Sequence, residues 1–173
     1  MLETKRLRLR HLVEGDAAFI RKLVNDSDFL RYIGDNGVQT DADAVAYIQN
    51  GPVASYERFG FGLNAVELVG TNELIGICGL LKRDSLPDPD VGFAFLPEFR
   101  RQGYAVESAF AVVYHARNSL GVTRVLAITT PDNAGSVRVL EKIGMRFERM
   151  ISVNEDEPEL KLFALDLPRN ANR

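Results

Sequence analysis

The sequence predicts one α/β (α+β) domain around a mixed, mostly antiparallel seven-stranded sheet, with the elements in the order β-α-α-β-β-β-α-β-α-β-β. Three observations support this. The 173 residues are 46% hydrophobic, enough for one domain with a full core. Segments with a period of two residues alternate with segments of helical period. A glycine turn, Arg100 to Ala105, separates a strand from a helix. We assign residues 1–168 to the domain and residues 169–173 to a frayed polar tail.

The first third of the chain predicts a strand and two helices. Residues 4–12 alternate leucine with arginine, which is typical of a half-buried strand with the arginines on its solvated face. Asp16 suits the N-cap of a helix that runs to Val24. A second helix starts at Thr40-Asp41 and continues through Ile48. The segment from Phe29 to Gln39 between them predicts a loop able to move.

The rest of the chain predicts an antiparallel meander, two strand and helix pairs and a final hairpin. The expected strands are Phe59 to Val69, Leu74 to Leu81, Asp90 to Leu96, Val122 to Thr129, Arg146 to Val153 and Glu159 to Leu167. The expected helices run from Ala105 to near Leu120-Gly121 and through Val137 to Ile143, where Gly144 ends the second.

Composition and charge argue against several classes of function. No apolar run reaches the ~18 residues of a membrane span, and the charges in Met1 to Lys5 do not fit a signal peptide. We expect a cytoplasmic protein with no membrane partner. A net charge of −3 argues against nucleic-acid binding. His11 and His115 lack ligand spacing, so no metal is expected, and the single Cys78 is expected in the core.

The turn Arg100-Arg101-Gln102-Gly103-Tyr104-Ala105 is the strongest functional feature. Two arginines, a glycine free to adopt positive φ and the unpaired N–H groups of a helix N-terminus together form a cradle for an anion. We therefore expect a phosphorylated ligand at this turn.

The turn resembles the Gln/Arg-x-x-Gly-x-Gly/Ala pyrophosphate loop of the GCN5-related N-acetyltransferases, abbreviated GNAT. Three further stretches resemble motifs of the RimJ/RimL-like subgroup, namely Leu2 to Arg10 (Thr-x-Arg-Leu-x-Leu-Arg), Arg101 to Glu107 (Gly-Tyr-Ala-x-Glu) and Asn133 to Met145 (Asn-x-x-Ser-x-x-x-x-Glu-Lys-x-Gly-Phe). The resemblance implies direct transfer of acetyl from acetyl-CoA to a primary amine, either a protein N-terminal α-amine or a small-molecule amine. A non-catalytic acyl-CoA-binding or sensing module is the alternative.

The resemblance also implies a cofactor site. The N–H groups of Arg101, Gln102, Gly103, Tyr104 and Ala105 would bind the CoA diphosphate. Arg100 and Arg101 would add charge-assisted bonds, or simply be surface cations. The pantetheine arm would lie along Phe93 to Leu96, where the fourth and fifth strands splay apart. The N–H of Phe95 or Leu96 would then polarise the thioester carbonyl.

Catalytic candidates follow from the same resemblance. Asn133 is a helix N-cap, a ligand of the pantetheine arm, or both. Ser136 would donate a hydrogen bond to the leaving thiolate, or is a plain helix serine. Leu140 stands where many relatives have a tyrosine acid. Asp90 is the best-placed carboxylate for a base, or only a turn aspartate.

The acceptor would enter over the loop from Phe29 to Gln39, with Phe29 and Tyr32 as contacts. The amine acceptor itself and a homodimeric state are left open.

Overall fold

The computed structural model describes residues 1–168, and the predicted tail 169–173 lies outside them. The strands are β1 (Leu2–Glu3), β2 (Leu7–His11), β3 (Leu63–Leu68), β4 (Leu74–Leu81), β5 (Asp90–Phe95), β6 (Arg124–Thr129), β7 (Arg146–Ile151) and β8 (Leu160–Asp166). The helices are α1 (Ala17–Val24), α2 (Ser27–Tyr32), α3 (Asp41–Ile48), α4 (Ala54–Phe59), α5 (Tyr104–Asn118) and α6 (Ala134–Lys142). Short 3-10 turns cover Glu14–Asp16 and Pro97–Phe99, and a π-helical turn covers Gln49–Val53.

The strands form one open sheet in the order β1-β2-β3-β4-β5-β6-β8-β7. Only the β5 and β6 pair is parallel within this sheet, which confirms the expected mixed, mostly antiparallel arrangement. The sheet has eight strands, so the expected count of seven was wrong. The additional strand β1 has two residues, paired as Leu2 with Leu9 and Glu3 with Arg8. Such a short segment shows no alternation in the sequence.

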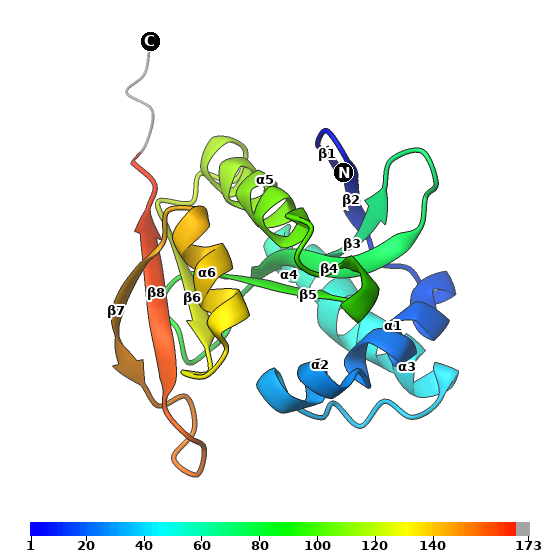
Figure 1. Ribbon diagram of the computed structural model, residues 1–173, viewed down its shortest axis with the longest axis horizontal. Helices are drawn as coiled ribbons and strands as arrows, with labels where there is room; N and C mark the ends of the chain where they lie inside the picture. Colours follow the sequence, from blue (N-terminus) through cyan, green and yellow to red (C-terminus); the bar gives the residue numbers. More distant parts are fainter. Residues whose placement is uncertain (169–173) are drawn as a thin grey trace.

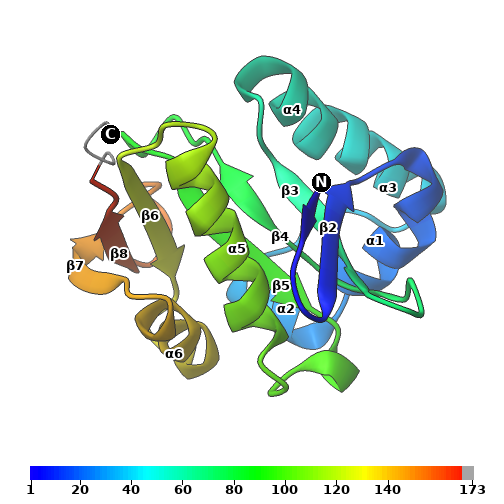
Figure 2. The same cartoon turned by 90° about the horizontal axis from the view of Figure 1, so that it is seen from above.

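Helices cover both faces of the sheet (Figure 1). On one face, α5 and α6 pack on a core that includes Leu9, Val91 and Phe163. Figure 2 shows α5 lying across this face. On the other face, α1, α2 and α3 pack on a second core that includes Ala65 and Leu96. We call this second side the α3 face.

Two helices, α2 and α4, occur in segments for which the sequence did not predict a helix. Asp26 lies in the polar run that ends α1, as expected. Its carboxylate also accepts the N–H groups of Asp28 and Phe29 and so caps α2. The expected loop from Phe29 to Gln39 is therefore helical up to Tyr32 and irregular only afterwards.

The helix α4 precedes β3 and ends at Phe59, the first residue of the segment expected as a strand. Pro52 lies in the π-helical turn that connects α3 to α4. Gly60, with φ of 77°, ends α4 in the left-handed conformation that glycine tolerates. Strand β3 consequently begins only at Leu63.

The arginine face of β2 is not freely solvated, contrary to the prediction. Arg10 donates to the buried Asp16 through both Nη groups at 2.9 Å and to Glu67 through Nε at 2.6 Å. Arg8 bonds Glu3 at 2.8 Å. Alternation in the sequence predicted the correct face but could not show the acidic partners, because Glu3, Asp16 and Glu67 come from other elements that meet β2 only in the folded chain.

Candidate functional site

The sheet opens between β5 and β6, as the resemblance implied. The two strands are paired only at Asp90 and Leu126, whereas β4 and β5 stay paired from Gly76 and Phe95 to Leu81 and Asp90. Beyond Asp90 the parallel strands diverge, and the connections that lead into α5 and α6 follow their far ends (Figure 1). An open strand edge between two helix N-termini suits an extended ligand that carries an anionic group.

The edge of β5 presents the N–H groups of Phe93 and Phe95 to this opening. Leu96 donates its N–H to the Ile75 carbonyl at 2.9 Å, so its N–H points toward β4. Because successive N–H groups of a strand alternate in direction, those of Phe93 and Phe95 point the opposite way, toward β6. The expectation that Leu96 polarises a carbonyl in the opening is therefore corrected. Its N–H is already bonded, and Phe95 stays the predicted donor.

The glycine turn adopts the conformation of an anion cradle. Arg101 has φ of 61° and Gly103 has φ of 85°, so two of three consecutive residues are left-handed. The turn leads directly into α5, whose first N–H groups have no partners within the helix. Tyr104 and Ala105 form the first turn of α5 and are half-buried. The backbone of residues 101–105 is thus shaped to bind an anion.

The Arg100 side chain is directed to α2 instead of serving as the diphosphate cation we expected. Its Nη groups donate to Asp26 at 2.5 Å and Asp28 at 2.6 Å, and its Nε donates to the Phe95 carbonyl at 2.9 Å. Burial opposes but does not cancel the effect of Arg100, which holds the pKa of Asp26 below its usual value. Arg100 therefore ties the end of β5 to the start of α2.

Sequence reasoning missed Arg6, which supports the turn. Its Nη1 donates to the Gln102 carbonyl at 2.9 Å, its Nε donates to Glu107 at 2.7 Å, and its guanidinium lies over the Tyr104 ring at 4.5 Å. Thr4 also donates to Glu107, at 2.6 Å. The motif Thr4-x-Arg6 contained this information, but alternation placed Arg6 on a solvated face.

The start of α6 forms the other side of the opening. The Asn133 side chain accepts the N–H of Ser136 at 3.1 Å, which confirms that Asn133 is an N-cap. Ser136 is half-buried in the first turn of α6, and Leu140 is buried one turn further. Ser136 is therefore the hydroxyl that α6 offers near its N-terminus.

Asp90 lies at the vertex of the opening, the point where β5 and β6 are still paired. It is 1% exposed, and both of its oxygens accept from Nε of Arg83, each at 3.1 Å. Burial raises the pKa of Asp90, and the charge of Arg83 opposes this effect. The carboxylate is thus buried and ion-paired, and any proton it accepts must reach it through a water molecule, because the guanidinium of Arg83 stays protonated.

The two expected acceptor contacts differ in position. Phe29 is 4% exposed and packs in the core of the α3 face, so its side chain offers almost no surface to an acceptor. Tyr32 is half-buried at the end of α2, with the Arg31 guanidinium 4.8 Å from its ring centre. Arg31 also forms an ion pair with Asp132, at 3.1 Å. The end of α2 therefore lies beside the connection that leads into α6.

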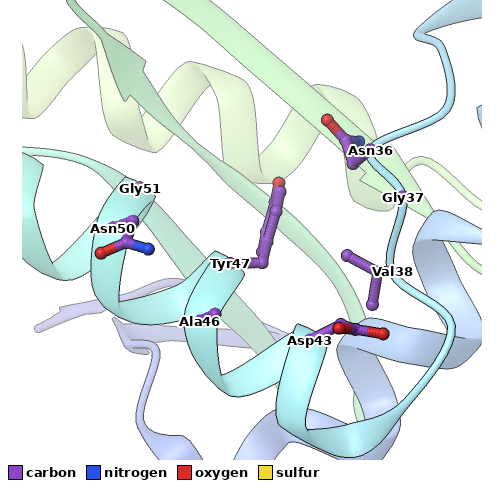
Figure 3. A pocket seen from close by; sticks show the side chains of 8 residues that line it. All are labelled: Asn36, Gly37, Val38, Asp43, Ala46, Tyr47, Asn50 and Gly51. Carbon is purple, nitrogen blue, oxygen red and sulfur yellow. The ribbon is translucent and has the colours of Figure 1, made fainter.

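An open hollow of about 430 Å³ lies between α3 and the segment that follows α2. Its lining residues are Asn36, Gly37, Val38, Asp43, Ala46, Tyr47, Asn50 and Gly51. Figure 3 shows Tyr47 extending from α3 toward the sheet, with Asn36 on the opposite segment. Burial raises the pKa of Tyr47, and the charge of Arg83 opposes this rise. The sequence contained no indication of this hollow, because its sides come from separate segments.

Other candidates have structural roles. Cys78 is fully buried, as predicted, and burial raises the pKa of its thiol to about 12. His11 stacks on Tyr56 with the ring centres 3.7 Å apart. Residues 1–168 contain no cluster of His, Cys, Asp or Glu suited to a metal ion. None of their helices is both long and apolar enough to cross a membrane.

The splayed sheet and the cradle define an α/β protein that binds an extended ligand with an anionic group. A family model described as Acetyltransferase (GNAT) domain matches residues 6–146. The chain therefore belongs to the GNAT family, as the sequence motifs implied, and is an acetyltransferase.

Individual relatives agree with this assignment. The chain is 31% identical to the uncharacterized N-acetyltransferase YnaD of Bacillus subtilis over 147 residues, 85% of this chain and 83% of that protein. The crystal structure of a GNAT-family acetyltransferase from Bacillus anthracis superposes with a TM-score of 0.79 at 27% identity and covers 95% of this chain and 96% of that one. The fold also matches a spermidine N-acetyltransferase from Vibrio cholerae in complex with CoA and spermine, with a TM-score of 0.78 at 17% identity and coverage of 95% and 97%.

Proposed function

We propose that this enzyme transfers acetyl from acetyl-CoA directly to a primary amine. The observation that carries the proposal is the opening between β5 and β6, with the cradle of residues 101–105 at its mouth. The diphosphate binds the cradle, and the pantetheine arm pairs with the free edge of β5 at Phe93 and Phe95. The solved Vibrio cholerae enzyme with this fold holds CoA. A cytoplasmic location also stays a prediction.

In the reaction the amine nitrogen bonds to the thioester carbon, the carbon–sulfur bond breaks and CoA leaves as a thiolate that takes up a proton. The Phe95 N–H stabilises the oxyanion. Ser136 donates a hydrogen bond to the departing sulfur. A serine hydroxyl is far less acidic than a thiol with a pKa of ~8.5, so the proton itself comes from the ammonium product or water.

Asp90 is our proposal for the group that removes the proton of the amine, acting through water. An α-amine with a pKa of ~8 requires only about 1.4 kcal/mol for deprotonation at pH 7, whereas a lysine with a pKa of ~10.4 requires about 4.6 kcal/mol. One buried, ion-paired carboxylate acting through water can therefore serve an α-amine more readily than a lysine. This favours acceptors with a weakly basic amine.

Calorimetric titration with acetyl-CoA, followed by measurement of CoA release with a panel of amines, tests the proposal. We expect saturable binding and acceptor-dependent release, with the acetylated amine detected by mass. The Ser136→Ala variant tests the catalytic role separately, because Ser136 lies on α6 and not in the diphosphate cradle. Loss of acetyl-CoA binding in that variant would contradict its assigned role.

A further inference from the structure

The guanidinium of Arg100 lies at the free edge of β5, beside the N–H that the proposed reaction uses. Its Nε donates to the Phe95 carbonyl at 2.9 Å. The N–H and the carbonyl of one strand residue point to the same side, and those of Phe95 point away from β4, because the next residue, Leu96, bonds Ile75 there. Within residues 1–168, β6 pairs with β5 only at Asp90. Arg100 therefore stands at the opening, next to the Phe95 N–H.

The start of α2 holds the other end of the same guanidinium. The Nη groups of Arg100 donate to Asp26 at 2.5 Å and to Asp28 at 2.6 Å. Asp26 is also the N-cap of α2, since its carboxylate accepts the N–H groups of Asp28 and Phe29. One guanidinium thus joins the end of β5 to the first turn of α2, and α2 extends from there toward the connection that leads into α6 (Figure 1).

The exposure of the charged groups shows which ion pair of α2 fixes its position. The Arg100 side chain is 31% exposed and that of Asp26 is 11% exposed. At the other end of α2, Arg31 pairs with Asp132, but these side chains are 62% and 59% exposed. Exposed pairs contribute little, whereas a forked guanidinium beside a mostly buried carboxylate has a defined geometry. Arg100 is therefore the main polar tie between α2 and the sheet.

Arg101, the next residue, is available for the role that Arg100 does not fill. Its side chain is exposed, and no group within residues 1–168 accepts a hydrogen bond from it. Its own φ of 61° is part of the cradle. In contrast, carboxylates already take both Nη groups of Arg100, so a diphosphate would have to displace them. The two arginines of the turn thus have separate tasks.

We infer that Arg100 is a positioning residue for acetyl transfer, which holds the Phe95 N–H and the helix α2 in a fixed relation. This inference rests on the proposed function. Tyr32, the expected acceptor contact, ends α2, so Arg100 joins the helix on the acceptor side to the group that stabilises the oxyanion. Arg100 acts through Phe95 and Asp26 and not on a substrate. Because a displacement of about 1 Å can cost about a hundredfold in rate, loss of the tie should affect kcat more than cofactor binding.

Two variants break the tie from opposite ends. Arg100→Lys keeps the positive charge, but one ammonium cannot reproduce the fork that serves Phe95, Asp26 and Asp28 together. Asp26→Asn keeps a residue suited to cap α2 and removes the charge that holds Arg100. Each variant should lower kcat by about 10- to 100-fold and leave the Kd for acetyl-CoA, measured by calorimetric titration, nearly unchanged. Because both remove one interaction, the double variant should be no slower than the slower single variant.

Two further variants serve as controls. Arg124 is also 31% exposed and also bonds two carboxylates, those of Asp166 and Glu148, but it starts β6 on the side of the paired Leu126 away from the opening. Arg124→Lys should therefore lose stability without a change in kcat. Arg101→Gln removes the exposed arginine of the cradle and should weaken acetyl-CoA binding by about tenfold.

Hydrogen exchange followed by mass spectrometry measures the tie without any reaction. Asp26→Asn should increase exchange in α2 and also in residues 95–100, which belong to a distant part of the sequence. Arg124→Lys should increase exchange in neither segment. An increase confined to α2 would contradict a tie that holds the end of β5.

Two kinetic results would also overturn the inference. If Arg100→Lys weakens acetyl-CoA binding as much as Arg101→Gln does and keeps a normal kcat, Arg100 is a diphosphate ligand. If folded Arg100→Lys and Asp26→Asn variants both keep the wild-type kcat, the tie is purely structural. Failure of the proposed function looks different, because the wild-type protein then binds acetyl-CoA and acetylates no amine, and the positioning role falls together with the reaction.

Discussion

Replacement of Gly103 by alanine should change the shape of the cradle and so weaken acetyl-CoA binding. A control variant with the same loss of stability shows whether the weaker binding comes from the cradle or from the fold. At φ of 85° an L-residue costs roughly 1–2 kcal/mol. The added Cβ would also lie 3.2 Å from Nη2 of Arg6, whose neighbouring Nη1 bonds the Gln102 carbonyl. If the turn shifts enough to lose one charged hydrogen bond to the diphosphate, about 1.5–3 kcal/mol of binding disappears. Acetyl-CoA affinity should then fall by about 10- to 150-fold.

Gly121→Ala is the matched control. Gly121 follows the other end of α5 with φ of 66°, and nothing lies within 4 Å of its added Cβ. Both variants should lose about 1–2 kcal/mol of stability, which corresponds to a Tm decrease of about 2–8 °C for a domain of this size. Calorimetric titration should show weaker acetyl-CoA binding only for Gly103→Ala. Equal affinity in the two variants at equal Tm would refute the placement of the diphosphate.

Four further changes have defined outcomes. Ser136→Ala should lower kcat by about ten- to a hundredfold and leave acetyl-CoA affinity nearly intact, as stopped assays of CoA release can show, and an unchanged kcat would assign the thiolate to another donor. Arg6→Gln should raise the KM for acetyl-CoA more than the KM for the acceptor, and equal changes would contradict its support of the cradle. Tyr32→Ala should raise the KM for the acceptor far more than that for acetyl-CoA, whereas a lower Tm with normal kinetics would make Tyr32 structural. Asp16→Asn should destabilise the fold by about 2–4 kcal/mol in urea at pH 7, because Arg10 loses its buried partner. Burial opposes but does not cancel the effect of Arg10, which lowers the pKa of Asp16, so this stabilisation is complete above the ordinary pKa of ~3.9 and is lost as pH falls through the lowered value. A variant equally destabilised well below that pH would contradict the assignment.

Local patterns predicted most of the fold. Strand β4 begins and ends at the expected residues, Leu74 and Leu81, because an apolar run between turns is recognisable by itself. The helix α2 was missed because its cap, Asp26, lies in a polar run that also ends α1. Strand β1 was missed because two residues acquire strand geometry only by pairing with β2.

The candidate site was predictable where the chemistry lies in the backbone of one segment. The cradle around Gly103 follows from residue order alone, and so does the capping role of Asn133. Side-chain partners were not predictable, because they depend on contacts between distant segments. Arg100 reaches Asp26, Arg6 reaches Glu107 and Arg83 reaches Asp90 only in the folded chain.

The most direct test of the central claim is mass detection of acetylated amine after incubation of the protein with acetyl-CoA and a mixture of amino acids, amino acid amides, peptides and diamines. The account predicts that at least one primary amine gains a single acetyl group in step with CoA release, and that the Gly103→Ala variant needs far more acetyl-CoA for the same rate. Saturable binding of acetyl-CoA without any acetylated product would contradict the account and identify the chain as an acyl-CoA-binding module.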